Sequence, residues 1–219
     1  MTATEQMPVP GRFITFEGID GAGKSTHLAR AVEQLRAAGI SVVQTREPGG
    51  TALAESLRSL MLNEAMGPRT ELLLMFAARD DHVRQCIAPA LAAGHWVVCD
   101  RFTDSSFAYQ GGGRQMSWQE IETLAGWVEQ GIEITRTYLF ELPAQVAAQR
   151  RLAARPADRF EQENLAFFER VREGYRRRAA MPGQQARFHL LDASAAPPVI
   201  GAALAADLAQ LIRRWRPAS

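Results

Sequence analysis

The sequence is poor in cysteine and contains no long apolar run. Its 219 residues include two cysteines, Cys86 and Cys99, which form no C-x-x-C pair. A disulfide framework or a zinc site is therefore not expected. We expect Cys99, which lies inside an apolar run, to be part of the core. No stretch approaches the ~18 consecutive apolar residues that a membrane-spanning helix needs.

The sequence also lacks an excess of charge of either sign. It carries 25 basic and 24 acidic residues, for a net charge of +1. A general nucleic-acid or membrane-surface binder would need an excess of Lys and Arg, so we expect neither partner, although a local basic pocket is compatible with this balance. Residues 1–11 lack the basic and apolar regions of a signal peptide and are interpreted as a flexible tail. The expected compartment is the cytoplasm.

What the sequence does contain is a regular alternation of strand and helix signals. Strands are predicted at 12–17, 41–45, 95–100, 136–141 and 188–192. Helices are predicted at 24–38, 51–62, 68 to about 93, 117–130, 144–154, 164–181 and 197–214. The segment after residue 100, with its three consecutive glycines at 111–113, is predicted to be a loop. This order predicts one α/β domain over residues 12–219, with a five-stranded parallel sheet flanked by helices.

A glycine-rich segment joins the first strand to the first helix. It reads Gly18-Ile-Asp-Gly-Ala-Gly-Lys-Ser25 and fits the P-loop pattern G-x-x-x-x-G-K-[ST]. Such a loop turns its backbone N–H groups towards a phosphate chain, and the lysine reaches the β- and γ-phosphates. The alternative is an ordinary strand-to-helix turn. The residues expected to bind ATP are Gly18, Ile19, Asp20, Gly21, Ala22, Gly23, Lys24, Ser25 and Thr26.

Two oxygen-bearing side chains are candidates for binding Mg²⁺. The Ser25 hydroxyl occupies the metal-binding position of the P-loop pattern. Asp100 ends an apolar strand, where P-loop proteins place an acidic residue near the metal. The alternative for Asp100 is a carboxylate that caps the next turn.

The remaining motifs narrow the class of P-loop protein. There is no base-reading N-K-x-D loop and no transporter signature. Several arginines lie away from the P-loop, as expected for a kinase that must bring two anionic substrates together. A kinase for a different nucleotide and a nucleotide-dependent switch protein remain the alternatives.

Six ordered motifs surround and follow the P-loop. They are Glu17-Gly18 with the P-loop, Thr45-Arg-Glu-Pro-Gly-Gly50, Met75-Phe-Ala-Ala-Arg79, Asp100-Arg101-Phe102, Ala108-Tyr-Gln-Gly111 and Asp158-Arg159-Phe-Glu161. Over nearly the whole chain after the tail, the sequence resembles the thymidylate kinase family in its bacterial form. The resemblance implies a P-loop NTPase fold with a short mobile lid at about 150–161. It also implies transfer of the ATP γ-phosphoryl group to dTMP, a need for Mg²⁺, and a homodimer.

The resemblance implies roles for individual residues as well. The expected catalytic residues are Lys24, Arg101, Arg155 and Arg159, the last two as lid arginines that close over ATP. The expected dTMP-binding residues are Asp20, Arg46, Glu47, Pro48, Phe76, Arg79, Arg101, Ser105, Ser106, Tyr109 and Gln110, with the peptide before Pro48 in the cis form. Phe76 is expected to stack on thymine, Arg79 to bond the edge of the base, and Tyr109 to exclude a ribose 2′-hydroxyl.

Simpler interpretations stand beside several of these roles. Phe76 and Arg79 are three residues apart on a helix and can face one pocket, but a core Phe and a surface Arg fit the spacing too. Tyr109 fits a packed aromatic residue. The lid arginines fit a solvated basic turn, and which of Arg150, Arg151 and Arg155 contacts phosphate is left open. The run at 72–75 fits either core or a subunit interface. The four histidines form no cluster in the sequence and are assigned no chemical role.

Overall fold

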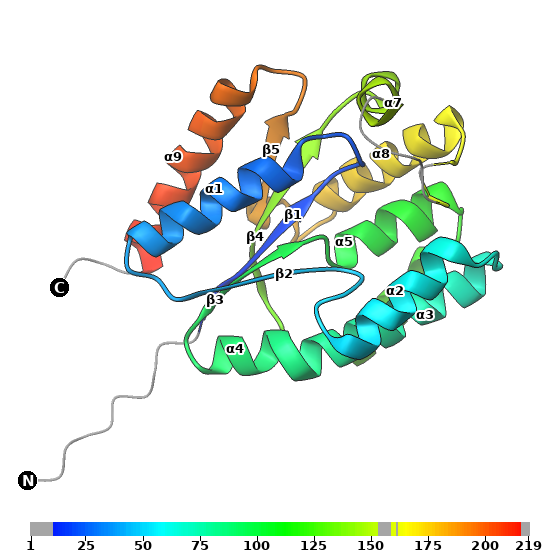
Figure 1. The fold of residues 1–219 in the computed structure, drawn as a ribbon, viewed down its shortest axis with the longest axis horizontal. Coiled ribbons are helices and arrows are strands. Elements are labelled where there is room, and N and C mark those ends of the chain that lie inside the picture. Colours follow the sequence, from blue (N-terminus) through cyan, green and yellow to red (C-terminus); the bar gives the residue numbers. More distant parts are fainter. Residues whose placement is uncertain (1–10, 153–158, 161, 216–219) are drawn as a thin grey trace, which may run out of the picture.

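The structure is a computed structural model that describes residues 11–152, 159–160 and 162–215. Five strands form one sheet in the order β2-β3-β1-β4-β5, and every neighbouring pair is parallel (Figure 1). Their bounds are β1 (Phe13–Glu17), β2 (Val42–Arg46), β3 (Trp96–Asp100), β4 (Ile134–Glu141) and β5 (Phe188–Asp192). The predicted five-stranded parallel sheet is confirmed.

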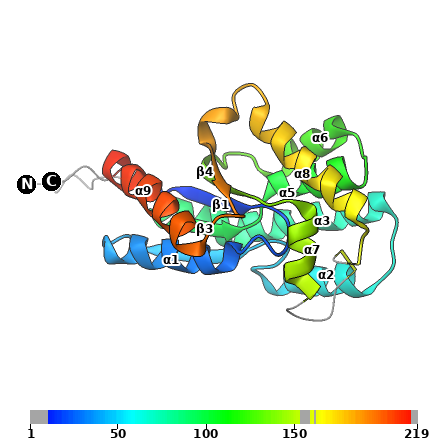
Figure 2. The same cartoon turned by 90° about the horizontal axis from the view of Figure 1, so that it is seen from above.

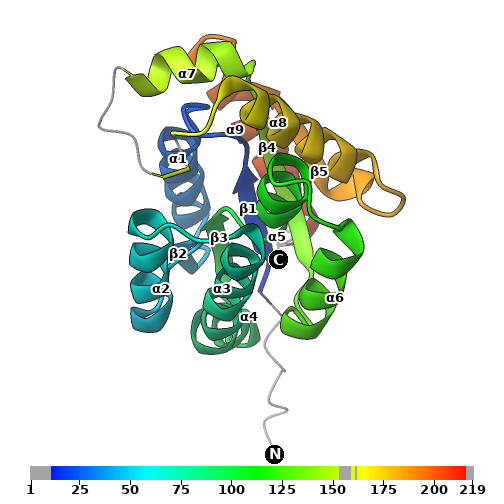
Figure 3. The same cartoon turned by 90° about the vertical axis from the view of Figure 1, so that its right-hand side faces the viewer.

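Helices cover both faces of the sheet. The helices are α1 (Lys24–Ala37), α2 (Ala52–Asn63), α3 (Pro68–His82), α4 (Ala88–Ala92), α5 (Thr103–Ser106), α6 (Trp118–Val128), α7 (Ala144–Leu152), α8 (Leu165–Ala180) and α9 (Pro197–Trp215), with π-helical segments η1 (Val83–Ile87) and η2 (Phe107–Gly113) and a 3₁₀ turn η3 (Gln185–Arg187). Side chains along β1 point alternately to the two faces of the sheet, so the core has two separate parts. Ile14 and Phe16 pack in the cluster that holds α1 and α9, whereas Phe13 packs with Val83 and Ile87 on the other side. Figure 3 shows α1 to one side of β1 and α5 and α6 to the other.

The parallel arrangement brings the carboxyl ends of the strands to one edge. There, Asp100 on β3 pairs in register with Arg46 on β2 and with Phe16 on β1. In all three views α7, which opens the predicted lid, lies beside the loop that joins β1 to α1 (Figures 1, 2 and 3). Ligands of open α/β sheets bind at this edge, so the candidate site residues are expected there. Among the helices that the structure describes, none combines the length and apolar character that a bilayer crossing requires.

The long helix predicted from residue 68 to about 93 is present but changes its hydrogen bonding on the way. It runs as α3, then as the π-helical η1, then as α4. Pro89 lies just beyond η1, and a proline inside a helix has no N–H to donate to the preceding turn. A π turn is a common way to accommodate such a break without ending the helix.

The prediction of a loop after residue 100 is wrong, because residues 103–113 are helical and form α5 and η2. Gly112 and Gly113 allow α8 to pack closely against this helix, whereas Gly111 makes room for Trp118 on α6. A Cβ on Gly112 would lie 2.6 Å from the carbonyl oxygen of Arg170, and one on Gly113 would lie 2.5 Å from the Phe167 ring. The glycines therefore serve helix packing, and no loop-forming conformation is needed at residues 111–113.

We expect Gly112→Ala to lower the free energy of unfolding by about 1–3 kcal/mol, because the added methyl group overpacks the contact with α8. Gly126→Ala is the matched control, since a Cβ at that helical position meets nothing within 4 Å. It should be neutral or stabilise by about 0.5–1 kcal/mol. Urea denaturation of both variants measures the difference. Equal stability of the two would contradict the packing role of Gly112.

Candidate active site

The loop between β1 and α1 has the backbone of a phosphate cradle. Gly18, Gly21 and Gly23 have φ values of 134°, 88° and 82°. A Cβ on Gly18 would lie 2.5 Å from the carbonyl oxygen of Phe140, whereas one on Gly23 would meet nothing within 4 Å. No side chain caps the first turn of α1. The N-terminus of α1 and the open face of the loop therefore offer backbone N–H groups to an anion.

Lys24 begins α1 and folds back over the loop. Its buried Nζ donates to the carbonyl oxygens of Gly18 and Ile19 at 3.0 and 3.2 Å. Burial lowers the pKa of Lys24, and the positive charge of Arg101 lowers it further. A phosphate in the cradle would raise the pKa of Lys24 again, because it places the opposite charge next to the ammonium group.

Ser25 and Asp100 line the same open pocket beside the cradle. The Oδ1 atom of Asp100 is buried and has no hydrogen-bond partner in the described part of the chain. No three His, Cys, Asp or Glu side chains of the described residues gather into a metal site. This arrangement fits Mg²⁺, which binds through one or two protein oxygens together with substrate phosphates and water.

Arg101 joins the cradle to a second pocket. It follows β3 and has a left-handed backbone with φ of 71°. Its Nη2 donates to Asp20 Oδ1 at 2.7 Å and to the Tyr109 hydroxyl at 3.2 Å, and Tyr109 donates to the other Asp20 oxygen at 3.2 Å. Burial alone would raise the pKa of Asp20, but Arg101 and Lys24 outweigh it and lower the pKa. Asp20 is therefore a carboxylate, and it links the P-loop to the guanidinium.

The second pocket holds about 550 Å³ of empty space. It is lined by Asp20, Glu47, Pro48, Arg58, Leu62, Met75, Arg101, Tyr109, Gln110 and Phe160. Six of these were predicted, and the Glu47–Pro48 peptide is cis as expected. Arg58, Leu62, Met75 and Phe160 were missed. Arg58 donates to the carbonyl oxygen of Pro48 at 3.1 Å, a contact between α2 and a loop that no local motif indicates.

Behind this pocket lies a buried charged network centred on Glu47. Arg79 Nε donates to Glu47 Oε2 at 2.7 Å, and its Nη2 donates to Ser106 Oγ at 3.1 Å. The guanidinium lies 4.6 Å from the centre of the Phe76 ring. The predicted residues Phe76, Arg79 and Ser106 are thus brought together, and neither Phe76 nor Arg79 is a surface side chain.

His82 completes the network, although no chemical role was predicted for it. Its Nδ1 lies 3.0 Å from Glu47 Oε1, and its Nε2 lies 2.6 Å from Thr45 Oγ1. Burial lowers the pKa of His82, but hydrogen bonds to Cys86 and Glu47 outweigh it and raise the pKa to about 9. The one available signal was the spacing of three between Arg79 and His82 on a helix, which puts both on one face.

Some predicted residues lie apart from this centre. Arg46 is half-exposed and pairs with Glu55 at 2.8 Å. Arg159 donates to the carbonyl oxygen of Met61 and to Glu71, both at 2.7 Å, so it lies against α2 and α3. Its role as a lid arginine stays a prediction.

The other lid arginines are described only in part. Arg155 lies outside the described residues, as does the side chain of Arg151. Arg150 donates to the carbonyl oxygen of Ala193 at 3.1 Å. The structure therefore leaves open which of these three arginines contacts phosphate.

A phosphate cradle that shares an arginine with a second pocket defines a P-loop phosphotransferase with two anionic substrates. Comparison with known proteins agrees. The family model described as thymidylate kinase matches residues 16–200. A curated relative from Bordetella pertussis, named thymidylate kinase, is 52% identical to this chain over 202 residues. The match covers 92% of this chain and 96% of the relative. A relative of the same name in Thiobacillus denitrificans is 54% identical over 187 residues, covering 85% and 91%. The chain belongs to the thymidylate kinase family.

The raised pKa of His82 makes stability depend on pH. A pKa of about 9 in the folded chain exceeds the ~6.5 of an unfolded histidine. The stabilisation is therefore complete below about pH 6.5 and is lost as the pH rises through 9. We expect the wild type to lose more stability than His82→Gln between pH 6.5 and 9.5, as measured by urea denaturation at each pH. Parallel pH dependences of the two proteins would contradict the assignment.

Proposed function

We propose that this chain transfers the γ-phosphoryl group of ATP to the phosphate of dTMP, giving dTDP and ADP, a step towards dTTP. Membership of the thymidylate kinase family supports this reaction. The observation that carries it in the structure is Arg101, whose guanidinium contacts Asp20 in the P-loop and lines the second pocket. One cation is thereby shared between the donor and acceptor sites.

The chemistry that this site must perform is alignment and charge neutralisation. The acceptor oxygen belongs to a phosphate monoester with a second pKa near ~6, so it is already ionised at neutral pH. No general base is required. Lys24 and Arg101 supply positive charge on either side of the transferring group, and Arg155 and Arg159 are proposed to add to it from the lid when it closes. Lys24 is buried and Arg101 is largely so, which strengthens these interactions because solvent screens them less.

The network behind the acceptor pocket is proposed to bind the base and sugar of dTMP. Phe76 would stack on thymine while Arg79, held by Glu47, bonds its edge. Gln110 and Ser106 add further contacts. Tyr109 is proposed to disfavour a ribose 2′-hydroxyl, since its ring fills the pocket wall beside Asp20. Arg46 and Ser105 remain predicted contacts to the acceptor.

Mg²⁺ is part of the proposal, with Ser25 and Asp100 as its protein ligands. The unpaired Oδ1 atom of Asp100 supports this assignment. When bound, the ion would neutralise negative charge on the ATP phosphates. The remaining P-loop backbone, with Thr26, is proposed to hold the ATP phosphates.

Arg101→Ala should reduce kcat by on the order of 10³-fold, because the guanidinium acts on the transferring group. ATP affinity should change little, since the cradle is intact. A coupled ADP-release assay with dTMP measures turnover, and titration calorimetry measures ATP binding. Arg84→Ala is the control, since that exposed arginine pairs with Asp80 on its own helical run.

Near-normal turnover of Arg101→Ala would contradict the assignment. The same assay with dUMP and purine monophosphates, and with no acceptor, distinguishes the other possible functions. A different preferred acceptor would indicate another nucleotide kinase. Slow hydrolysis that is independent of any acceptor would indicate a switch protein.

A homodimer is also part of the proposal, as is one kinase domain spanning residues 12–219 in the cytoplasm. Exposed apolar side chains support the dimer. Leu53 on α2, Leu73 on α3 and Trp127 on α6 are 53%, 53% and 74% exposed. Helix α3 packs against both α2 and α6, so these helices are neighbours. The apolar run at 72–75 contributes to both the core and this exposed face, because Leu72 is buried whereas Leu73 is exposed.

We expect the double variant Leu73→Glu and Trp127→Glu to elute as a monomer in size-exclusion chromatography with light scattering, because charges are costly in an apolar interface. The control is Leu190→Glu, which places the same charge at an equally exposed leucine on β5. A dimer that survives the double variant would exclude this face as the interface.

A further inference from the structure

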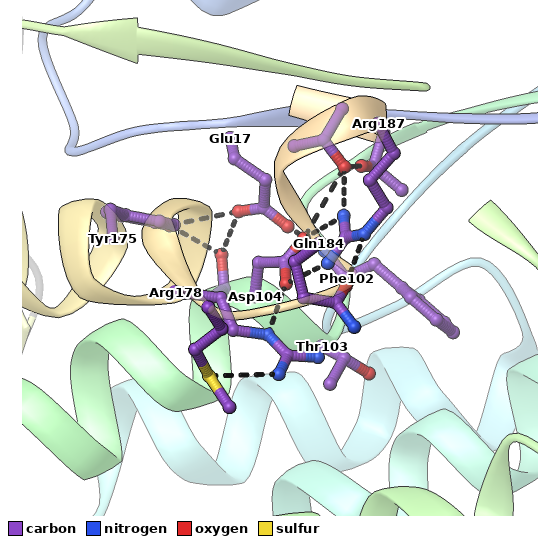
Figure 4. A network of polar contacts seen from close by, with 12 residues as sticks. Glu17, Phe102, Thr103, Asp104, Tyr175, Arg178, Gln184 and Arg187 are labelled. Atoms are coloured by element: carbon purple, nitrogen blue, oxygen red, sulfur yellow. Dashed lines mark hydrogen bonds and ion pairs between the residues drawn. The ribbon is translucent and has the colours of Figure 1, made fainter. Parts of the chain in front are cut away.

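Glu17 is a buried carboxylate that the reaction described so far does not use. It ends β1, directly before the P-loop, and its side chain is fully buried. The sequence marks it as part of a motif but gives it no role. Figure 4 shows Glu17 facing Tyr175 of α8, with Phe102 and Asp104 of the segment after β3 close by. Both of its oxygens are in use.

The hydrogen-bond donors to Glu17 come from residues that follow or contact Arg101. Oε1 accepts from the backbone N–H of Phe102 at 2.7 Å. Oε2 accepts from the Ser105 hydroxyl at 2.6 Å and from the Tyr175 hydroxyl at 3.0 Å. Three donors from two distant parts of the chain therefore converge on one carboxylate.

The two hydroxyls are also the support of the Arg101 guanidinium. Arg101 Nη1 donates to Ser105 Oγ at 3.2 Å and to the Tyr175 oxygen at 3.0 Å. A guanidinium only donates, so both hydroxyl oxygens accept from Arg101 and their hydrogens point away from it. These hydrogens are directed to Glu17 Oε2 or, across a 2.8 Å contact, from one hydroxyl to the other. Glu17 thereby orients the two oxygen atoms that hold Nη1, while Nη2 remains bonded to Asp20.

Glu17 also fixes the backbone at Arg101. The positive φ of 71° at Arg101 is a conformation that non-glycine residues rarely adopt. The flanking amides hold it. The N–H of Arg101 donates to the Phe16 carbonyl at 2.9 Å, and the next N–H, that of Phe102, donates to Glu17. Such backbone conformations persist when their surroundings fix them, and they gather at functional sites.

A buried carboxylate at this position destabilises the folded chain, because its charged form is removed from water. Burial raises the pKa of Glu17 to about 7, and the negative charge of Asp104 adds to the increase, while Ser105, Arg101 and Phe102 oppose it. Titratable groups with such perturbed environments concentrate at functional sites.

We propose that Glu17 is a positioning residue for phosphoryl transfer, which holds Arg101 against Asp20 and the acceptor phosphate through the Ser105 and Tyr175 hydroxyls and the Phe102 amide. The proposal rests on the role of Arg101 in the proposed function. Glu17 itself touches neither nucleotide. It sets the position and orientation of the Arg101 guanidinium. Misplacement of such a group by about 1 Å is enough to lower the rate on the order of 10²-fold.

Glu17→Gln tests the proposal with almost no change of shape. The amide has one oxygen and one NH₂ group, so it can accept from the Phe102 N–H or from the hydroxyls, but not from both sides. We expect kcat with dTMP to fall by on the order of 10²-fold, with the Kd of ATP within about twofold of the wild type. Tyr175→Phe, which removes one of the two bridging hydroxyls, should lower kcat by a smaller factor. A kcat of Glu17→Gln within threefold of the wild type would overturn the proposal.

Asp104→Asn is the control for the loss of a buried negative charge. Asp104 is fully buried and bonded by Arg178 and Arg187 at 3.0 and 2.7 Å, without a bond to Arg101 (Figure 4). We expect it to lower the Tm while kcat stays within threefold of the wild type. Glu17→Gln should show the reverse pattern, with a large loss of kcat and little loss of Tm. If both variants lose Tm and kcat in the same proportion, the role of Glu17 is structural and the proposal fails.

A double-mutant cycle with Arg101→Lys tests whether Glu17 acts through Arg101. The lysine keeps the charge but cannot form the guanidinium fork. If the proposal holds, adding Glu17→Gln to this background lowers kcat by less than twofold, because the group that Glu17 positions is already lost. Losses that multiply would overturn it. Failure of the proposed function is recognised separately, as a wild type without dTMP-dependent ADP release.

Discussion

The ion pair between Arg101 and Asp20 is the interaction on which the site depends. Its two partners come from the loop after β3 and from the P-loop, so the contact at 2.7 Å ties the acceptor pocket to the phosphate cradle. Four side-chain oxygens hold the guanidinium, those of Asp20, Tyr109, Ser105 and Tyr175. A buried guanidinium without such partners would be strongly destabilising. With them, it keeps its charge and lies between the P-loop and the second pocket, where we propose that the two anionic substrates meet.

The fold supplies this contact through the parallel sheet and through buried charge behind it. Parallel strands end at one edge, which places the P-loop after β1 next to the residues after β3. Behind the acceptor pocket, Glu47 is held by both Arg79 and His82. The side chains of this network are buried, and at low dielectric their electrostatic interactions are strong and hold the groups in one geometry. Such preorganisation is what a reaction without covalent or acid–base chemistry requires.

The features predicted correctly are those that neighbouring residues determine. Continuous apolar runs indicated the strands of a covered parallel sheet, and the P-loop was recognised from eight consecutive residues. The features that were missed depend on distant segments. The glycines at 111–113 suggested a loop, because nothing near them in the sequence shows that Gly174 and its neighbours on α8 pack against them. Tyr175 and Arg58 reach the site from helices whose sequences are ordinary, and His82 acquires its partners only when β2 and α3 meet. Arg159 shows the same limit, since its partner Glu71 lies 88 residues away.

A crystal structure with dTMP and a non-hydrolysable ATP analogue tests the central claim most directly, because it shows where Arg101 binds when both substrates are present. The account predicts that an Arg101 Nη atom lies within about 3 Å of a dTMP phosphate oxygen while Asp20 and the Ser105 and Tyr175 hydroxyls still hold the guanidinium. A dTMP phosphate bound elsewhere, for example by Arg58 on α2, with Arg101 making no contact to it, would contradict the account.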